Sequence, residues 1–215
     1  MKVSAGVRKV LVVKIAIDGS VHELVLPDGW VVFPPLPGDP PGQIVGYEGP
    51  DSMANVFVRA ISPDEQLPAD RAGLLDGIRA CLPDNAAIIK VDTGVTEHGY
   101  PYRCSIVKTL MRPSGVQYNL TFQFVAERMY QIQGYFGEVG MTGMRDTVVW
   151  DLWKRAQMAG QITEESAPWM QDPYDGQTDR FAMNVSEREQ FDGQFPSHPL
   201  SVARQFLRDH VLLVA

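Results

Sequence analysis

VQYNLTFQFVAERMYQIQGYFGEVGMTGMRDTVVW, residues 116–150, is the stretch of sequence that decides the fold of this chain. Apolar and polar residues alternate along residues 117–124 and again along residues 130–136. Such alternation is typical of antiparallel strands that bury one face and leave the other in water. We expect a hairpin that turns at Glu127-Arg128. The side chains expected to face the core are those of Tyr118, Leu120, Phe122, Phe124, Tyr130, Ile132 and Phe136.

Four glycines spaced three apart end this hairpin and lead into a helical pattern: Gly134, Gly137, Gly140 and Gly143. Their spacing differs from the G-x-G-x-x-G of dinucleotide sites and from the G-x-x-x-x-G-K-[ST] of a P-loop. We interpret them as positions of close packing, a bulge and a tight connection from strand to helix. The alternative is an anion held at the start of the helix with the help of Arg145.

Further strands and helices complete the expected architecture. Apolar alternation or short apolar runs predict strands at residues 7–17, 21–26, 30–33, 44–47, 54–61, 86–91 and 100–110. Helical periodicity predicts helices at residues 68–82, 144–159 and 199 to about 210. The chain is therefore expected to be an α+β protein, with an antiparallel sheet of about six to eight strands packed between helices in an α/β/α sandwich.

The helix expected at residues 68–82 carries its apolar residues on one stripe, which includes Leu74, Ile78 and Cys81. Asp70 suits its first turn, where a negative charge favours the helix dipole. The only other cysteine, Cys104, falls in an expected strand. We expect both cysteines to be buried free thiols, and a disulfide between them is the alternative.

Composition limits the classes of partner. The formal net charge is −7, which argues against nucleic acid and anionic membranes, because basic surface holds both. The apolar run at residues 10–17 is interrupted by Lys14 and has no cleavage site of the signal-peptide type. No apolar run approaches the ~20 residues that a membrane helix needs. The expectation is a cytoplasmic protein without membrane insertion.

The last quarter of the chain differs from the rest. Residues 161–195 hold eight acidic residues and two arginines, together with several aromatic residues. Disordered segments are poor in aromatic residues, so we expect an ordered extension that packs on the core. The predicted division is a core at residues 1–160 and an acidic extension at residues 161–215, within one structural domain.

Three segments resemble the PsbP-like family, which includes the oxygen-evolving-complex subunit P and the Ran-binding Mog protein. They are Leu26–Trp30, the strand Tyr130–Glu138, and Gly143–Asp146 leading into a helix. The resemblance spans roughly residues 21–160. It implies an antiparallel sheet between helices, and a role in binding, assembly or chaperoning rather than catalysis, with another protein as partner. The acidic extension is not part of the family's common core.

The candidate site residues follow from these patterns. Binding positions are expected at Tyr135, Glu138, Arg145, Trp169, Tyr174 and His198. No catalytic residue, metal ligand or cofactor is expected, because the four histidines show no zinc spacing and no G-x-S-x-G elbow occurs. The alternative function is a small-molecule hydrolase, with a Ser-His-Asp arrangement assembled across the sequence in the sheet groove or under the extension.

Three further interpretations concern the extension. Asp172, Asp175 and Asp179 suggest a solvated acidic loop, with calcium binding as the alternative. His198 lies just before Pro199, at an expected helix start, where capping is its structural role. Finally, the extension could occupy the binding face of its own core.

Overall fold

The computed structural model describes residues 11–17, 20–26, 29–34, 37, 42–96, 98–111, 113, 115–178 and 181–208. Within these ranges the chain forms strands, three α-helices and short 3-10 helices. In chain order they are β1 (Leu11–Ile17), β2 (Ser20–Leu26), β3 (Trp30–Phe33), β4 (Gln43–Glu48), β5 (Ser52–Ala60), η1 (Pro63–Glu65), α1 (Arg71–Cys81), β6 (Ala86–Val95), β7 (Pro101–Leu110), β8 (Val116–Val125), β9 (Met129–Glu138), α2 (Met144–Met158), η2 (Val185–Glu187), η3 (Glu189–Phe191) and α3 (Pro199–Phe206).

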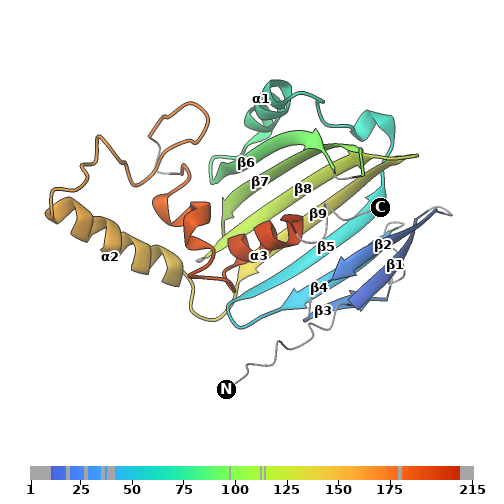
Figure 1. Ribbon diagram of the computed structural model, residues 1–215, viewed down its shortest axis with the longest axis horizontal. Helices are drawn as coiled ribbons and strands as arrows, with labels where there is room; N and C mark the ends of the chain where they lie inside the picture. Colours follow the sequence, from blue (N-terminus) through green and yellow to red (C-terminus); the bar gives the residue numbers. More distant parts are fainter. Residues whose placement is uncertain are drawn as a thin grey trace, which may run out of the picture.

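The main sheet has seven antiparallel strands in the order β3-β4-β5-β9-β8-β7-β6, and β1 and β2 form a separate hairpin (Figure 1). The α+β fold class and the strand number expected from the sequence are confirmed. Most neighbours are also consecutive in the chain. The exception is the pairing of β9 with β5, which places the β8–β9 hairpin in the middle of the sheet.

The β8–β9 hairpin has the register and burial that the alternation predicts. Val125 lies opposite Met129, and the turn closes where the backbone N–H of Ala126 donates to the carbonyl of Arg128 at 2.9 Å. The apolar side chains expected to face the core are all buried. Gly134 is needed on this face because a Cβ there would lie 2.5 Å from the ring of Phe136.

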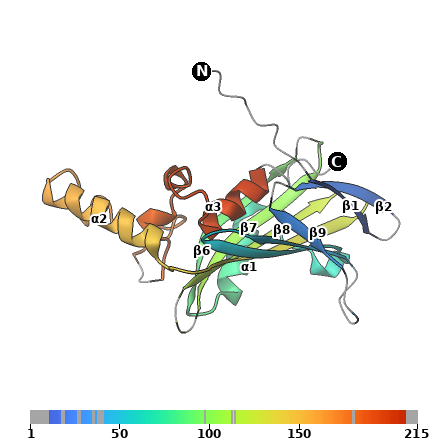
Figure 2. The same cartoon turned by 90° about the horizontal axis from the view of Figure 1, so that it is seen from below.

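Helices cover both faces of the sheet, as expected. On one face, which we call the inner face, α3 packs Leu200 and Phe206 into the main core. On the other, the outer face, α1 lies over the edge strand β6 and packs Leu74 against Ile88 and Val91 (Figure 2). α2 covers neither face. It projects from the end of the sheet (Figure 1) and packs against the extension.

The sequence predicts that the polar side chains of β8 lie in water, but part of the outer face is buried. Gln123 on β8 is only 1% exposed. The segment between η1 and α1 crosses over it: Gln123 accepts from the backbone N–H of Leu67 at 2.9 Å and donates to the carbonyl of Glu65 at 3.0 Å. The side-chain amide of Gln123 is therefore buried by a segment from elsewhere in the chain, which the strand pattern could not indicate. Farther along, toward β9 and β5, the outer face is open.

Several predicted boundaries shift. Residues 7–10 and the turn at Asp18-Gly19 lie outside the described residues, while β1 and β2 do pair, with Ile17 opposite Ser20. Asp70 is not in the first turn of α1 but caps the helix, accepting from the backbone N–H of Gly73 at 2.8 Å. α3 starts at Pro199 as predicted, and residues 209–215 lie outside the described residues.

The prediction that both cysteines are buried is wrong for Cys81, which is exposed. α1 lies over an edge strand, so the stripe is fully buried only at Leu74, and its last turn extends past the sheet. Cys104 is buried as predicted, and both thiols are free. Burial raises the pKa of the Cys104 thiol to about 12.

This difference predicts that the folded protein reacts with a thiol reagent at Cys81 only. Thiolates are the reactive species, and Cys104 is both buried and protonated at neutral pH. Titration with Ellman's reagent is expected to release one equivalent of thionitrobenzoate from the folded chain and two in urea. A Cys81→Ser variant should release none before unfolding, and rapid reaction of that variant would contradict the burial of Cys104.

Candidate functional site

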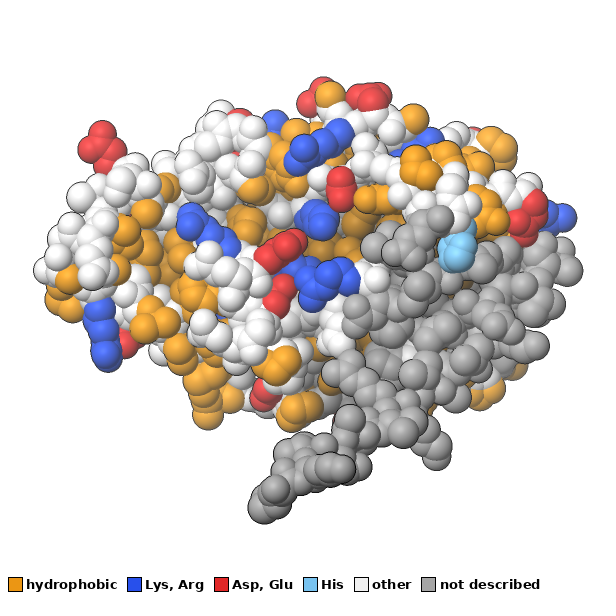
Figure 3. Space-filling view, in the orientation of Figure 1, with side chains coloured by type: hydrophobic (Ala, Val, Ile, Leu, Met, Phe, Trp, Pro, Cys, Tyr) orange, Lys and Arg blue, Asp and Glu red, His pale blue; other side chains and the backbone are white. Residues whose placement is uncertain are grey.

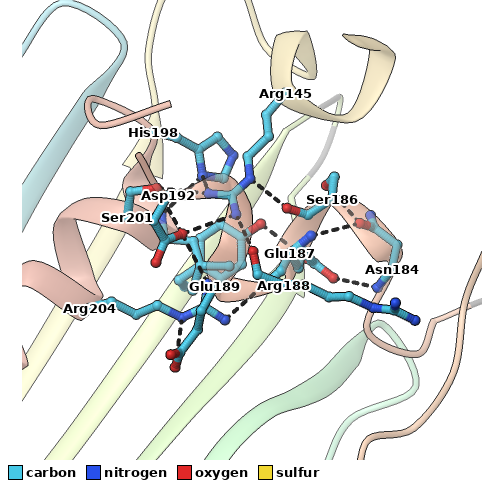
Figure 4. Close-up of polar contacts among 12 residues, drawn as sticks. Arg145, Asn184, Ser186, Glu187, Arg188, Glu189, Asp192, His198, Ser201 and Arg204 are labelled. Atoms are coloured by element: carbon cyan, nitrogen blue, oxygen red, sulfur yellow. Dashed lines mark hydrogen bonds and ion pairs between the residues drawn. The ribbon is translucent and has the colours of Figure 1, made fainter. Parts of the chain in front are cut away.

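Three of the six candidate residues, Glu138, Arg145 and His198, lie together at the start of α2, beside the extension. Figure 4 shows Arg145 and His198 with their partners in the extension. Arg145 is the centre of this group and is 1% exposed. Its guanidinium donates to two backbone carbonyls of the extension, Ser186 at 2.6 Å and Arg188 at 3.1 Å. We call the assembly of buried polar residues around it the clasp.

Asp192 supplies the negative charge opposite Arg145. One carboxylate oxygen, Oδ1, accepts from Arg145 Nη2 at 3.0 Å, from Arg204 Nη1 at 3.1 Å and from the Ser201 hydroxyl at 3.1 Å. Burial lowers the pKa of Arg145, and Asp192 opposes this effect by stabilising the charged form. Arg204 also donates to the carbonyl of Glu187 at 2.7 Å. The clasp therefore joins α2, the 3-10 helices and α3 through charged hydrogen bonds.

A second buried pair ties the extension to the sheet. Lys108 on β7 donates to Glu187 at 2.8 Å, and the hydroxyl of Tyr118 on β8 donates to the other carboxylate oxygen at 3.0 Å. Burial, followed by the nearby charge of Glu187, raises the pKa of Tyr118 well above its usual range. Glu187 also completes a capping box with Asn184 at the start of η2. These contacts anchor residues 184–187 on the inner face.

His198 is the N-cap of α3, as the sequence predicts: its Nδ1 accepts from the backbone N–H of Leu200 at 3.2 Å. Since Nδ1 is an acceptor there, the ring is neutral with its proton on Nε2. That nitrogen faces Glu138 Oε1 at 3.8 Å. Burial, reinforced by the positive charges of Arg145 and Arg204, lowers the pKa of His198 to about 3.

This geometry does not form a hydrolytic triad. A triad needs the serine hydroxyl hydrogen-bonded to the histidine, and the histidine oriented by a carboxylate. Among the described residues, Ser201 hydrogen-bonds to Arg145 at 2.8 Å and to Asp192, not to His198. A histidine with a pKa of about 3 is also far from the value suited to a base at neutral pH. The hydrogen bonds of the clasp link α2 to the extension, and they do not include the serine–histidine contact that a triad needs.

The start of α2 holds a carboxylate of the chain itself. The backbone N–H of Gly143, the N-cap in the left-handed region with φ of +74°, donates to Glu138 Oε1 at 2.9 Å. Burial raises the pKa of Glu138. Arg145 points away to the extension, so the alternative of an external anion held by Arg145 is not supported by the contacts.

The open part of the outer face contains a groove of about 660 Å³, which we call the outer-face groove. It crosses strands from the sheet edge inward. Its lining residues are Phe33, Pro34, Ile44, Asn55, Phe57, Gln117 and Tyr135. The register explains how they meet: Ile44 lies between Phe33 and Phe57 in one row across β3, β4 and β5, and Asn55 lies opposite Tyr135 in the next row. None of these residues is charged.

The polar residues of the outer face fall into two groups. Beside the groove, side-chain amides and hydroxyls bond to one another, as in Asn119 with Thr109 at 3.0 Å and Thr121 with Gln133 at 2.9 Å. In the groove, the side chains of Asn55 and Tyr135 make no hydrogen bond within the described part of the chain. Gln117 donates to Asn119 at 2.7 Å through its amide nitrogen. The groove thus carries polar groups with unused hydrogen-bonding capacity.

The remaining candidates lie apart from the clasp and from the groove. Trp169 packs edge-on against Trp150 and Trp153 of α2, with ring centroids 4.8 and 5.6 Å away. Tyr174 hydrogen-bonds through its hydroxyl to the backbone of Val91 on β6. That contact occupies the backbone N–H and carbonyl of Val91 on the edge strand, and unpaired groups of this kind can pair with another chain.

The acidic loop is held by a basic residue of α1. Arg79 pairs with Asp172 at 3.2 Å and with Asp175 at 2.8 Å. Asp179 lies outside the described residues.

Helix α2 carries exposed hydrophobic side chains, which include Met144, Val148 and Leu152. Hydrophobic side chains are seen at the left of Figure 3, where α2 lies in the same orientation in Figure 1.

The sequence reasoning missed the acidic partners of the clasp, Asp192 and Glu187, as well as Ser201 and Arg204. Glu187 could have been found from the sequence, because Asn184-x-x-Glu187 is a capping-box pattern at the start of a helical turn. Of the residues that line the groove, only Tyr135 was among the predicted binding positions. The others could not be found from a local pattern, because they come together only through the pairing of strands far apart in the sequence.

Comparisons with known proteins assign no family to this chain. No protein-family profile matches the chain, and no curated protein sequence matches it. A similar solved structure is that of cyanobacterial PsbP (CyanoP) from Synechocystis sp. PCC 6803, at 15% identity and a TM-score of 0.38, covering 77% of this chain and 95% of that chain. At these values the similarity supports no statement about family or activity. None of the helices in the described ranges has the length and apolar character needed to span a bilayer.

Proposed function

We propose that this protein is a non-catalytic binding module and that the outer-face groove is its ligand site. The observation that carries the proposal is a groove in which apolar and aromatic side chains surround three polar ones, Asn55, Gln117 and Tyr135, with no charge among them. Binding sites commonly combine an apolar concave surface with a few polar groups that orient the ligand.

The arrangement of the extension supports this choice of face. α3 places Leu200 and Phe206 in the core of the inner face, and the clasp and the Lys108–Glu187 pair hold the extension there. The inner face is therefore filled by the chain itself. The outer face remains the side of the sheet that a partner can approach, and we propose that this partner is another protein.

The same arrangement weighs against a hydrolase. The charged and nucleophilic residues of the clasp are buried and bonded to one another, while the groove is lined by residues that lack a nucleophile paired with a base. We propose that the role of Glu138, Arg145 and His198 is to position the extension rather than to contact a ligand.

The test is capture of partners from a native lysate by three immobilised proteins: the wild type, Tyr135→Ala and Val148→Ala. Tyr135 and Val148 are equally exposed, at 40%, but Val148 lies on α2, away from the groove. Proteins retained by the wild type and by Val148→Ala are expected to be lost with Tyr135→Ala. Equal retention by all three would contradict the groove as the site. Ester hydrolysis that disappears with Ser201→Ala would favour the hydrolase.

A further inference from the structure

The chemistry of the groove indicates a class of ligand, an inference that rests on the proposed function. We propose that the outer-face groove binds an uncharged, proline-rich segment of a partner protein in the polyproline II conformation. The lining residues carry no charge, so they offer nothing to compensate a phosphate, a carboxylate or a basic side chain buried against them. Five of the seven are apolar or aromatic, which suits prolyl rings and aliphatic side chains.

The spacing of the aromatic residues fits this conformation. Phe33 and Phe57 lie in one row, separated by one strand, β4. Neighbouring strands are roughly 4.8 Å apart, so the backbone positions of these two residues are about 9.6 Å apart across the sheet. The ring of Phe33 leans onto β4, over Gly46, and so lies in the row that holds Asn55 and Tyr135. A polyproline II helix repeats every three residues, which is about 9.3 Å. Successive turns of such a ligand would therefore meet positions two strands apart, and the Phe33 ring over Gly46 on β4 and Tyr135 on β9 are such a pair, with Asn55 of β5 between them.

The polar groups fit the same ligand. A polyproline II segment makes no internal hydrogen bonds, and its prolyl residues present carbonyl acceptors without N–H donors. The amide of Asn55 and the hydroxyl of Tyr135 are donors in the groove with no partner in the described part of the chain. Aromatic grooves that supply a few donors are a recurring mode of proline-rich recognition, and the rigid ligand loses little entropy on binding.

Two other kinds of ligand fit less well. A peptide added as a β-strand pairs with the edge of a sheet, whereas this groove crosses the face of several strands. An oligosaccharide presents many hydroxyl groups that need directional partners, and only three polar side chains line the groove. Binding of an oligosaccharide in the groove would therefore contradict the proposed ligand class.

The experiment measures fluorescence anisotropy of a labelled peptide of Pro-Pro-Leu repeats, about nine residues long so that it spans three turns. Saturable binding by the wild type is expected, with none to a Gly-Gly-Ser peptide of equal length. Tyr135→Ala should weaken binding about tenfold or more, as for an interface anchor. Asn55→Asp, which keeps the side-chain shape, removes its N–H donors and places a negative charge in the uncharged groove, should also weaken it. Val148→Ala should bind as the wild type does, and circular dichroism checks that each variant is folded.

The outcomes separate the two proposals. If the Pro-Pro-Leu peptide does not bind, or binds Tyr135→Ala and Asn55→Asp as tightly as the wild type, the ligand class is overturned. If lysate partners are nevertheless lost with Tyr135→Ala, the binding function stands without it. Displacement of those partners by a neutral oligosaccharide such as maltohexaose would also overturn the ligand class. If neither measurement depends on Tyr135, both proposals fail.

Discussion

Replacing Arg145 with alanine is expected to lower the free energy of unfolding by about 3–5 kcal/mol, because it removes one of the two guanidinium groups that pair with the buried carboxylate of Asp192 and leaves two buried carbonyls without their donor. Arg145 is 1% exposed, and its guanidinium donates to Oδ1 of Asp192 and to the carbonyls of Ser186 and Arg188. Water cannot easily replace these donors at a site so thoroughly enclosed. Urea denaturation followed by circular dichroism measures the change.

The matched control for this variant is Arg155→Ala on the same helix. Arg155 also pairs with an aspartate, Asp151, at 2.7 Å, but the two side chains are 70% and 57% exposed. An exposed pair contributes roughly 0–1 kcal/mol, so this control should unfold close to the wild type. Limited proteolysis adds a local readout: cleavage of Arg145→Ala is expected first in residues 184–198. Equal stability of the two variants would show that the clasp does not hold the extension.

The fold was predictable where the pattern is local. The β8–β9 hairpin follows from alternation over consecutive residues, and its buried face matches the expectation residue by residue. The same pattern could not predict the burial of Gln123, because the cover comes from Leu67 and Glu65, more than fifty positions earlier in the chain. For Cys81 the error was in the other direction, because a residue predicted to be buried is exposed. The apolar stripe of a helix does not show whether the helix lies over the middle or over the edge of a sheet.

The candidate site was only partly predictable for a related reason. His198 could be placed as a cap because capping depends on adjacent residues, and the structure confirms it. The partners of Arg145 lie 41 to 56 positions away, and no spacing rule connects a helix start to them. The groove depends on the pairing of β5 with β9, which brings Asn55 opposite Tyr135. Such a long-range pairing is set by packing of the whole core rather than by either strand alone.

Acid is expected to destabilise the folded protein through His198. Its pKa is about 3 in the folded state, against about 6.5 in an unfolded chain. Between these values the unfolded chain binds a proton that the folded chain does not, so stability falls as the pH is lowered from 6.5 toward 3. At pH 5 this one group is expected to cost about 2 kcal/mol relative to pH 7 or above.

The variant that isolates this effect is His198→Asn, because asparagine is a good N-cap but does not titrate. The groups facing His198 are Arg145 and Arg204, which stay charged, and Glu138, whose raised pKa acts in the opposite direction as the pH falls. These groups remain in both proteins, so the difference between the two pH profiles reports His198. Urea unfolding at pH 7 and pH 5 should show the wild type losing about 2 kcal/mol more than His198→Asn. Parallel profiles would mean that His198 takes up its proton over the same pH range in the folded and unfolded states, which would contradict a lowered pKa in the folded protein.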